Sequence, residues 1–409
     1  MTENIMAKTW GCLIILLAAG LFFCDLCIAA RPDSPKLSTS DQKVLYKAGR
    51  AMENDRYEKA ESLLEAHIDK QKEQVVDYRV FFYLGNVYSV QNASQKALTA
   101  YKKATAIHAA DPAVWQNKAK ACYDLKRFSS AADHMEQAWR LQEKKDPVLL
   151  YQAAACRLTA GETRKAYILL ERLCGFSPET VKLQWLESFA YVCMELEKTE
   201  KALRTVHRLL DRQPDEPRWW KMLTNAYIKK EAYDRAAAAL KVHNRLVPCK
   251  QEDIIRLGDL YTAAGVPFKA AVQYEQALEW TKTSRHYQKT AQAYMAAHRL
   301  EKAAGILEQA LETVPSARLW HMQGVIHYNR NHPVKAYKAF QKSHELDSGK
   351  GRALLMMGYS ALKAGRYHSA ITAFEKASAF KPQEQAARQG LTAARANGDR
   401  ASIEEGSRN

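Results

Sequence analysis

Apolar residues recur along the chain at spacings of three and four, and the pattern restarts at regular intervals. In each unit a small residue is followed twelve positions later by Ala, and large apolar residues stand four positions outside most of these pairs. The pairs are Ala48/Ala60, Gly85/Ala97, Ala119/Ala131, Ala154/Ala166, Ala190/Ala202, Thr224/Ala236, Gly258/Ala270, Ala291/Ala303, Gly324/Ala336 and Gly358/Ala370. Because residues three and four apart share one face of a helix, each unit predicts two amphipathic helices, A and B.

Successive pairs stand 33 to 37 residues apart, and a Pro closes many of the units, as at Pro112, Pro248 and Pro315. Small side chains let two antiparallel helices approach closely. A Pro cannot continue a helix but readily begins the next one. One helical pair cannot bury its own apolar face, so consecutive pairs must stack on one another. The pattern therefore predicts an all-α solenoid over residues 41–382.

This arrangement resembles the tetratricopeptide repeat family, and Trp220–Pro248 and Ile254–Trp280 are good examples of it. The resemblance covers residues 42–382 and implies a right-handed α-solenoid of about ten helix–turn–helix repeats. Terminal repeats need a polar outer face, so residues 383–396 predict a capping helix. The polar residues 397–409 predict a disordered tail.

Two repeats depart from the family pattern. The first has Lys47 and His67 at packing positions, and the fourth has Arg157 where an aromatic side chain is usual. We expect looser packing in both repeats.

The N-terminus has the features of a secretory leader. Lys8 precedes the apolar run Gly11–Phe23, and the small residues Ala29 and Ala30 follow. These features predict a signal peptide over residues 1–30, cut after Ala29 or Ala30, and a flexible linker over residues 31–40. The alternative is an uncleaved anchor helix, although a full span needs about 20 apolar residues. The expected location is the periplasm, or the inner membrane with the repeats facing the periplasm.

Composition and charge narrow the range of partners. The chain has 409 residues, with 47% hydrophobic and 26% charged residues, as in folded proteins generally. Its formal net charge of +16 favours acidic partners. Export makes nucleic acid an unexpected partner, and an RNA-binding solenoid would require a leader that does not function. We expect the membrane to be touched only by the N-terminal segment, and only if that segment stays uncleaved.

The sequence offers no catalytic constellation. It lacks a phosphate-binding Gly-rich loop, an HExxH motif and a nucleophile elbow, so we expect neither an enzyme nor a cofactor. His321, His327 and His332 form the densest histidine cluster, but their spacing does not suit a shared metal, so no metal site is expected. The five cysteines beyond the leader are scattered, and we expect most of them to be small buried residues, with one disulfide between neighbouring helices left open. They are Cys122, Cys156, Cys174, Cys193 and Cys249.

In the tetratricopeptide family the A helices line a concave groove that binds peptides. Carried over to this chain, the resemblance places aromatic and aliphatic side chains in the groove, where they could bind apolar anchors or merely pack against the next repeat. These candidates are Tyr123, Tyr151, Tyr191, Ile228, Tyr328 and Tyr359.

Five polar residues match a more specific pattern within the family. Its carboxylate-clamp members hold a peptide's terminal carboxylate with basic residues and Asn from three successive repeats. The matching positions here are Lys221, Asn225, Arg256, Arg285 and Lys289, with Arg256 in place of the usual Asn. Several convergent donors could hold a C-terminus or an acidic side chain. A chain with 61 Lys and Arg residues also aligns cations by chance.

A second resemblance concerns the cellular process in which the protein takes part. Four segments are similar to the exported bacterial repeat proteins that accompany TonB–ExbB–ExbD energy-transducing systems: Leu149–Glu171, Pro217–Leu240, Leu257–Leu278 and Gly351–Phe374. This implies a non-enzymatic adaptor of the cell envelope with TonB-, ExbB- or ExbD-type partners. The alternative is a membrane-anchored assembly factor for pili, secretion or exopolysaccharide export.

Overall fold

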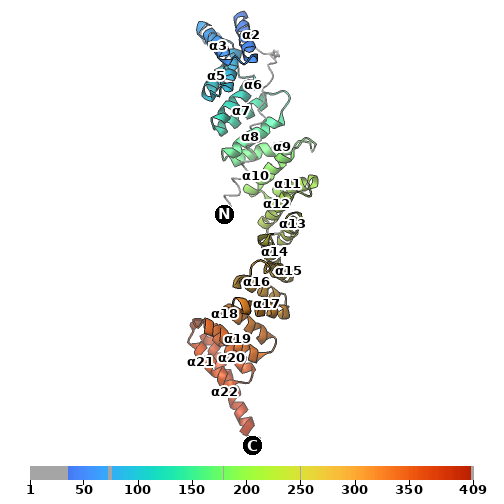
Figure 1. The fold of residues 1–409 in the computed structure, drawn as a ribbon, viewed down its shortest axis with the longest axis vertical. Coiled ribbons are helices and arrows are strands. Elements are labelled where there is room, and N and C mark those ends of the chain that lie inside the picture. The colour runs from blue at the N-terminus through green and yellow to red at the C-terminus, as the bar shows by residue number, and fades with distance from the viewer. Residues whose placement is uncertain (1–35, 72–75, 178, 249, 407–409) are drawn as a thin grey trace. The chain divides into compact units, whose positions relative to one another are not determined.

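The computed structural model describes residues 36–71, 76–177, 179–248 and 250–406, and these form only helices and connecting turns. The leader predicted over residues 1–30 and the start of the linker lie outside the described residues. The chain divides into two compact units, Met1–Arg212 (unit 1) and Gln213–Asn409 (unit 2). Within each unit, helices follow one another in antiparallel pairs (Figure 1). The predicted all-α repeat fold is confirmed.

Within the described residues, each unit contains five helical pairs. Unit 1 contains α2 (Thr39–Glu53), α3 (Tyr57–Gln71), α4 (Tyr78–Val90), α5 (Ser94–Ile107), α6 (Pro112–Asp124), α7 (Phe128–Leu141), α8 (Pro147–Thr159), α9 (Thr163–Cys174), α10 (Leu183–Glu195) and α11 (Thr199–Arg212). Unit 2 contains α12 (Pro217–Lys229), α13 (Tyr233–Leu246), α14 (Gln251–Ala263), α15 (Pro267–Ala277), α16 (Ser284–Ala296), α17 (Leu300–Thr313), α18 (Ala317–Asn329), α19 (Pro333–Leu346), α20 (Arg352–Lys363) and α21 (Tyr367–Ser378). A short 3₁₀ turn, η2 (Lys381–Gln383), leads into α22 (Glu384–Gly406).

Local signals begin and end these helices. Asp111, Asp146 and Glu216 each precede a Pro, and their side chains accept a hydrogen bond from a backbone N–H in the first turn of α6, α8 and α12. Each A helix is followed by one residue with positive φ, which ends the helix and turns the chain toward helix B. These residues are Asp55, Asn92, Lys126, Gly161, Glu197, Glu231, Gly265, His298, Asn331 and Gly365.

The small residues of the repeat lie in the core of each pair, as predicted, and each one precedes a large B-helix residue by sixteen positions. Where the small residue is Gly, the larger one is aromatic: Gly85/Tyr101, Gly258/Tyr274, Gly324/Phe340 and Gly358/Phe374. A Cβ added to any of these glycines would come within 2.4–2.6 Å of the ring. Where the small residue is Ala or Thr, the larger one is Leu, Val or Met, as in Ala291/Leu307. The summed volume of the two side chains is therefore roughly constant from repeat to repeat.

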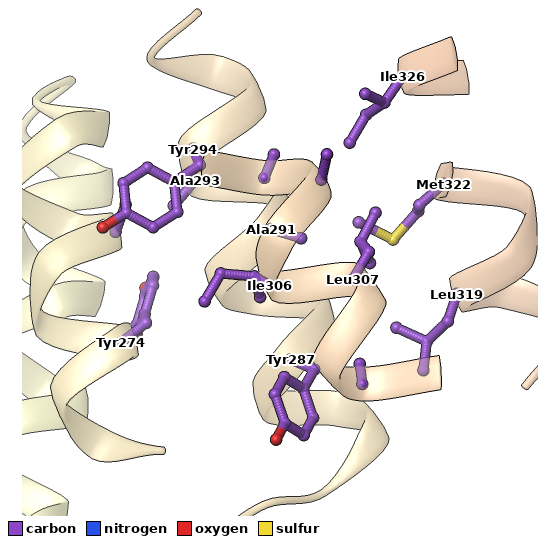
Figure 2. Packing of buried hydrophobic residues seen from close by; sticks show 14 of the residues in the cluster. Tyr274, Tyr287, Ala291, Ala293, Tyr294, Ile306, Leu307, Leu319, Met322 and Ile326 are labelled. Carbon is purple, nitrogen blue, oxygen red and sulfur yellow. The ribbon is translucent and has the colours of Figure 1, made fainter. Parts of the chain in front are cut away.

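The pairs of each unit are joined by apolar side chains that cross from one pair to the next. One cluster in unit 2 runs from α15 to α18. In Figure 2, Ile306 and Leu307 of α17 lie between Tyr294 on one side and Leu319 and Met322 on the other. Burial is therefore shared between consecutive repeats, as stacking requires.

The predicted boundaries need correction at both ends. Helix α2 begins at Thr39, within the predicted linker, because the Ser38 side chain accepts a hydrogen bond from the backbone N–H of Asp41 and caps the helix. Helix α22 begins at Glu384 but continues to Gly406, so the prediction of a disordered tail from residue 397 is wrong as far as residue 406. Ala394 is fully buried and Arg395 binds Glu375 at 3.2 Å, so contacts with α21 hold the helix beyond its apolar part. Residues 407–409 lie outside the described residues.

Four of the cysteines are buried free thiols, in agreement with the small apolar role predicted for them: Cys122, Cys156, Cys174 and Cys193. Burial raises the pKa of Cys156 and of Cys174 to about 12, so neither thiol is activated. Cys249 lies outside the described residues.

Candidate functional site

Three successive A helices of unit 2 carry the predicted clamp residues. Lys221 and Asn225 lie one turn apart on α12, Arg256 lies on α14, and Arg285 and Lys289 lie one turn apart on α16. Two hydrogen bonds connect these helices: one joins Arg256 to Asn225, and the other joins Lys289 to Asp259. We call this surface the A-helix face of unit 2.

Arg256 connects the first two helices of the A-helix face. Its Nη2 donates a hydrogen bond of 2.7 Å to Oδ1 of Asn225, thirty-one residues earlier. The substitution of Arg for the usual Asn therefore places a guanidinium beside the Asn of the preceding repeat. An Arg presents five N–H donors in a planar fork, so this bond leaves others to bind an anion.

Lys289 connects α16 to α14 through a residue that the sequence analysis did not single out. Its Nζ lies 2.8 Å from Oδ1 of Asp259, which also accepts a 2.7 Å hydrogen bond from the hydroxyl of Tyr274. Asp259 stands one repeat after Asn225, so the repeat alignment itself could have identified it. Because this carboxylate offsets the charge of Lys289, that lysine is less available to an anion than the sequence pattern predicts.

Lys221 and Arg285 are the most accessible cations of the clamp. Both are exposed. Within the described part of the chain, neither makes an ion pair or a hydrogen bond to another side chain. They flank the Arg256–Asn225 pair in sequence order, on α12 and α16. Two exposed cations and one partly engaged guanidinium are therefore available to a carboxylate.

The tyrosines carried over from the family are half-buried, and three of them contact the second helix after their own. The Tyr151 hydroxyl lies 3.2 Å from Oγ of Ser188 on α10, and the Tyr359 hydroxyl donates a 3.4 Å bond to the carbonyl of Ala386 on α22. Lys363 of α20 lies 4.7 Å from the ring centre of Tyr328. These contacts order the rings between repeats.

The remaining apolar candidates divide between the two units. Tyr123 packs edge-on against Phe128, with ring centres 5.5 Å apart. Tyr123 and Tyr191 are half-buried in unit 1, together with Tyr151, and Ile228 is half-buried in unit 2. Only Ile228, Tyr328 and Tyr359 thus belong to the same unit as the clamp residues.

Of the histidines of the ninth repeat, His321 and His327 are half-buried and His332 is exposed. Burial, assisted by the positive charge of Arg352, lowers the pKa of His321 to about 4. Burial also lowers the pKa of His327, whose ring centre lies 6.3 Å from that of His332. Within the described ranges, no group of three or more His, Cys, Asp or Glu side chains could hold a metal ion.

Comparisons with known proteins agree with the repeat pattern. A family model described as tetratricopeptide repeat matches residues 47–113, 189–248 and 289–350, and a second model with the same description matches residues 352–379. No protein of curated function matches the sequence.

Several solved structures are similar in fold. MamA protein is 20% identical, over 42% of this chain and 94% of that one, with a TM-score of 0.36. The tetratricopeptide domain of P58(IPK) is 16% identical, over 88% of this chain and 99% of that one, with a TM-score of 0.26. YrrB, described as a tetratricopeptide protein with an unusual peptide-binding site, is 17% identical, over 47% of this chain and 95% of that one, with a TM-score of 0.37.

At such identities a likeness concerns the fold alone, whereas the family models match this chain's own repeats. Together with ten helical pairs that bury a small residue beneath a large one, they show that this chain belongs to the tetratricopeptide repeat family of protein-interaction scaffolds.

Proposed function

We propose that the protein is a non-enzymatic adaptor that binds an acidic peptide segment of a partner protein on the A-helix face of unit 2. The observation that carries the proposal is the pair of exposed cations, Lys221 and Arg285, on the A helices before and after the one that carries Arg256, whose guanidinium Asn225 orients. Charge-assisted hydrogen bonds from convergent donors are about twice as strong as neutral ones. A peptide's terminal carboxylate, or an Asp or Glu side chain, supplies the complementary acceptors.

The half-buried apolar candidates of unit 2 supply the apolar part of the proposed interface. Ile228 lies two turns after Lys221 on α12 and can contact an apolar residue next to the bound carboxylate. Tyr328 and Tyr359 serve mainly to order the later repeats, given their contacts with α20 and α22. Most of the binding energy would then come from a few charged contacts, and the rest of the interface would contribute little.

Removing the two exposed cations tests the proposal. We expect Lys221→Ala combined with Arg285→Ala to weaken binding of an acidic peptide with a free C-terminus at least about tenfold, or about 1.4 kcal/mol. Fluorescence anisotropy measures the affinity, and circular dichroism should show unchanged helicity. Since exposed charges are screened by salt, the wild-type affinity should fall between about 0.05 and 0.3 M NaCl.

A matched control is available in the same unit. Lys338→Ala with Lys376→Ala removes the same charge from the B helices α19 and α21, where both lysines are exposed. This variant should bind like the wild type. Equal affinities of the wild type and the Lys221/Arg285 variant would reject the site. An amidated peptide distinguishes the terminal carboxylate from acidic side chains as the group recognised.

The proposed location is the bacterial cell envelope. It is supported by the leader-like residues 1–30, which lie outside the described residues. No helix within the described ranges is long and apolar enough to cross a membrane. Cell fractionation tests the two arrangements: a soluble periplasmic protein whose N-terminus is near Arg31 would support cleavage. Retention in the membrane with the leader intact would instead favour the anchored assembly factor.

The narrower proposal is an accessory role in a TonB-type transport system. Its support is the similarity of four segments to the exported repeat proteins of such systems, described above. Crosslinking in intact cells, followed by mass spectrometry, should capture TonB-, ExbB- or ExbD-type proteins. Capture of pilus, secretion or exopolysaccharide-export components instead would contradict this role and favour the alternative.

A further inference from the structure

A hollow on another side of unit 2 is distinct from the A-helix face. It has a volume of about 400 Å³ and lies between the B helices α13 and α15, with α14 beneath them. We call it the outer groove. Its apolar surface includes Ile254, Leu257 and Tyr261 of α14 and Phe268 and Val272 of α15. Phe268 and Val272, one turn apart on α15, remain 43% and 39% exposed.

Helix α14 separates the outer groove from the clamp. Ile254, Leu257 and Tyr261 recur at spacings of three and four and therefore share one side of the helix. Arg256 and Asp259, which belong to the A-helix face, are rotated by about half a turn from them at 100° per residue. One helix thus contributes to two surfaces that a single short peptide cannot occupy at once.

All the charged residues that line the outer groove are cations. Lys241 and Arg245 of α13 and Lys269 of α15 line it, and its lining contains no Asp or Glu. Within the described residues these three cations make no ion pair, and Lys269 only approaches the ring of Tyr261, at 5.7 Å. Arg299 and Lys302, from the next repeat, lie 5.6 and 5.8 Å from the ring centre of Phe268. The site therefore presents an apolar floor surrounded by uncompensated cations.

Amide side chains complete the lining. Asn244, Gln273 and Gln276 lie in the groove, and Oδ1 of Asn244 is buried without a hydrogen-bond partner in the part of the chain described here. A buried acceptor without a partner costs about 1–3 kcal/mol. A donor from a bound molecule, such as a peptide N–H, would recover part of that cost. Amides offer both donors and acceptors, which suits an extended backbone.

We propose that the outer groove is a second peptide-binding site, which takes an acidic segment of a partner protein with one bulky apolar side chain. The apolar side chain fills the hollow over Leu257 and Val272. Asp or Glu residues on either side of it meet Lys241, Arg245 and Lys269. The amides bind the intervening backbone. A volume of about 400 Å³ suits one large side chain and the adjoining backbone.

The same chemistry argues against other polyanions. A phosphate group would satisfy the cations but leave the apolar floor and the amides without partners. An anionic membrane surface is flat, whereas these residues line a hollow. The combination of apolar floor, amides and cations is the one that a mixed acidic and apolar peptide complements.

The test uses the full chain and blocked peptides. The probes are fluorescein-labelled hexapeptides of Asp and Glu with one central Phe or Leu, acetylated and amidated so that they lack a terminal carboxylate. We expect Lys241→Glu with Lys269→Glu to weaken their binding at least about tenfold, since two attractive charges become repulsive. Replacing the central Phe by Ser in the peptide should cause a loss of about the same size.

A second variant changes the apolar surface of the outer groove and keeps all of its cations. Val272→Asp places a carboxylate in the hollow and should also reduce binding at least about tenfold, because it excludes the apolar side chain and repels the acidic ones. Circular dichroism and thermal unfolding confirm that each variant is folded. Lys338→Glu with Lys376→Glu is the matched charge-reversal control and should bind the peptides like the wild type.

The outcomes separate this site from the clamp. The Lys221/Arg285 variant, in which the clamp can no longer bind an acidic side chain, should still bind the blocked peptides, and adding the Lys241/Lys269 changes to it should abolish that binding. The Lys241/Lys269 variant alone should keep its affinity for peptides recognised by their free C-terminus. The inference is overturned if the wild type binds none of the blocked peptides or if the Lys241/Lys269 variant binds them unchanged. It is also overturned if single-stranded RNA or phosphatidylglycerol vesicles bind through the same residues more tightly than the peptides do.

Discussion

Replacing Arg157 by Met is expected to lower the free energy of unfolding by about 3 kcal/mol, because a buried cation that holds three carboxylates is lost. Arg157 is only 4% exposed. Its guanidinium donates to Oε1 of Glu136 at 2.6 Å and to Oε2 of Glu162 at 2.6 Å, and it also binds Asp133. The looser packing predicted from an Arg at this position is wrong. Carboxylates from α7 and from the α8–α9 turn converge on it.

Urea denaturation of the wild type and the variant measures the difference. Met fills much of the same space, so the loss reports the missing charge and its hydrogen bonds rather than a cavity. Arg164→Met is the matched control, since Arg164 is exposed on α9 of the same repeat and has no ion pair within the described ranges. The control should change the unfolding free energy by less than about 0.5 kcal/mol. Equal stability of the wild type and Arg157→Met would contradict the role of the cluster.

The pH dependence provides a separate check. Hydrogen bonds from Arg157 and Lys165 lower the pKa of Glu162 from its usual 4.5 to about 2. A carboxyl group whose pKa is lower in the folded state contributes stability above its unfolded pKa and loses that contribution as the pH falls through its folded pKa. The stability advantage of the wild type over Arg157→Met should therefore shrink between pH 4.5 and pH 2. An advantage that grew over this range would contradict the assignment.

Gly324→Ala is expected to destabilise the ninth repeat by about 2 kcal/mol, although Ala is the better helix former. The new Cβ would lie 2.6 Å from Cε1 and 2.7 Å from Cδ1 of Phe340, whose ring is fully buried and cannot turn aside. Thermal unfolding measures the change. Gly305→Ala on α17 is the control, since its Cβ would meet no atom within 4 Å. That variant should be slightly more stable than the wild type.

Because the summed volume of the two side chains is constant between repeats, a smaller residue at position 340 should restore stability to the Gly324→Ala variant. Gly324→Ala combined with Phe340→Leu recreates the Ala291/Leu307 pair of the preceding repeat. The double variant should be more stable than the sum of the two single changes implies, by about 1 kcal/mol or more. Strict additivity of the two substitutions would show that the clash is not the cause.

The sequence by itself determined the number, length and order of the repeats, and with them the fold. Small residues, apolar spacings and closing prolines act within one helical pair, where helix geometry decides which side chains meet. The positions of Lys221, Asn225, Arg256, Arg285 and Lys289 on successive A helices followed from the same period. The structure has each of these residues on the A helix expected from the repeat period, and their role in binding stays a prediction.

Only the tertiary structure decided how the long polar side chains pair. Arg256 bonds Asn225, Lys289 is offset by Asp259, and Arg157 becomes the centre of a buried cluster. The length of α22 likewise depends on contacts with α21, and the outer groove depends on the gap between two B helices. These long side chains reach partners 5 to 31 residues away, in the same or a neighbouring repeat. Their pairing therefore follows from how the repeats pack, which the local periodicity of the chain does not encode.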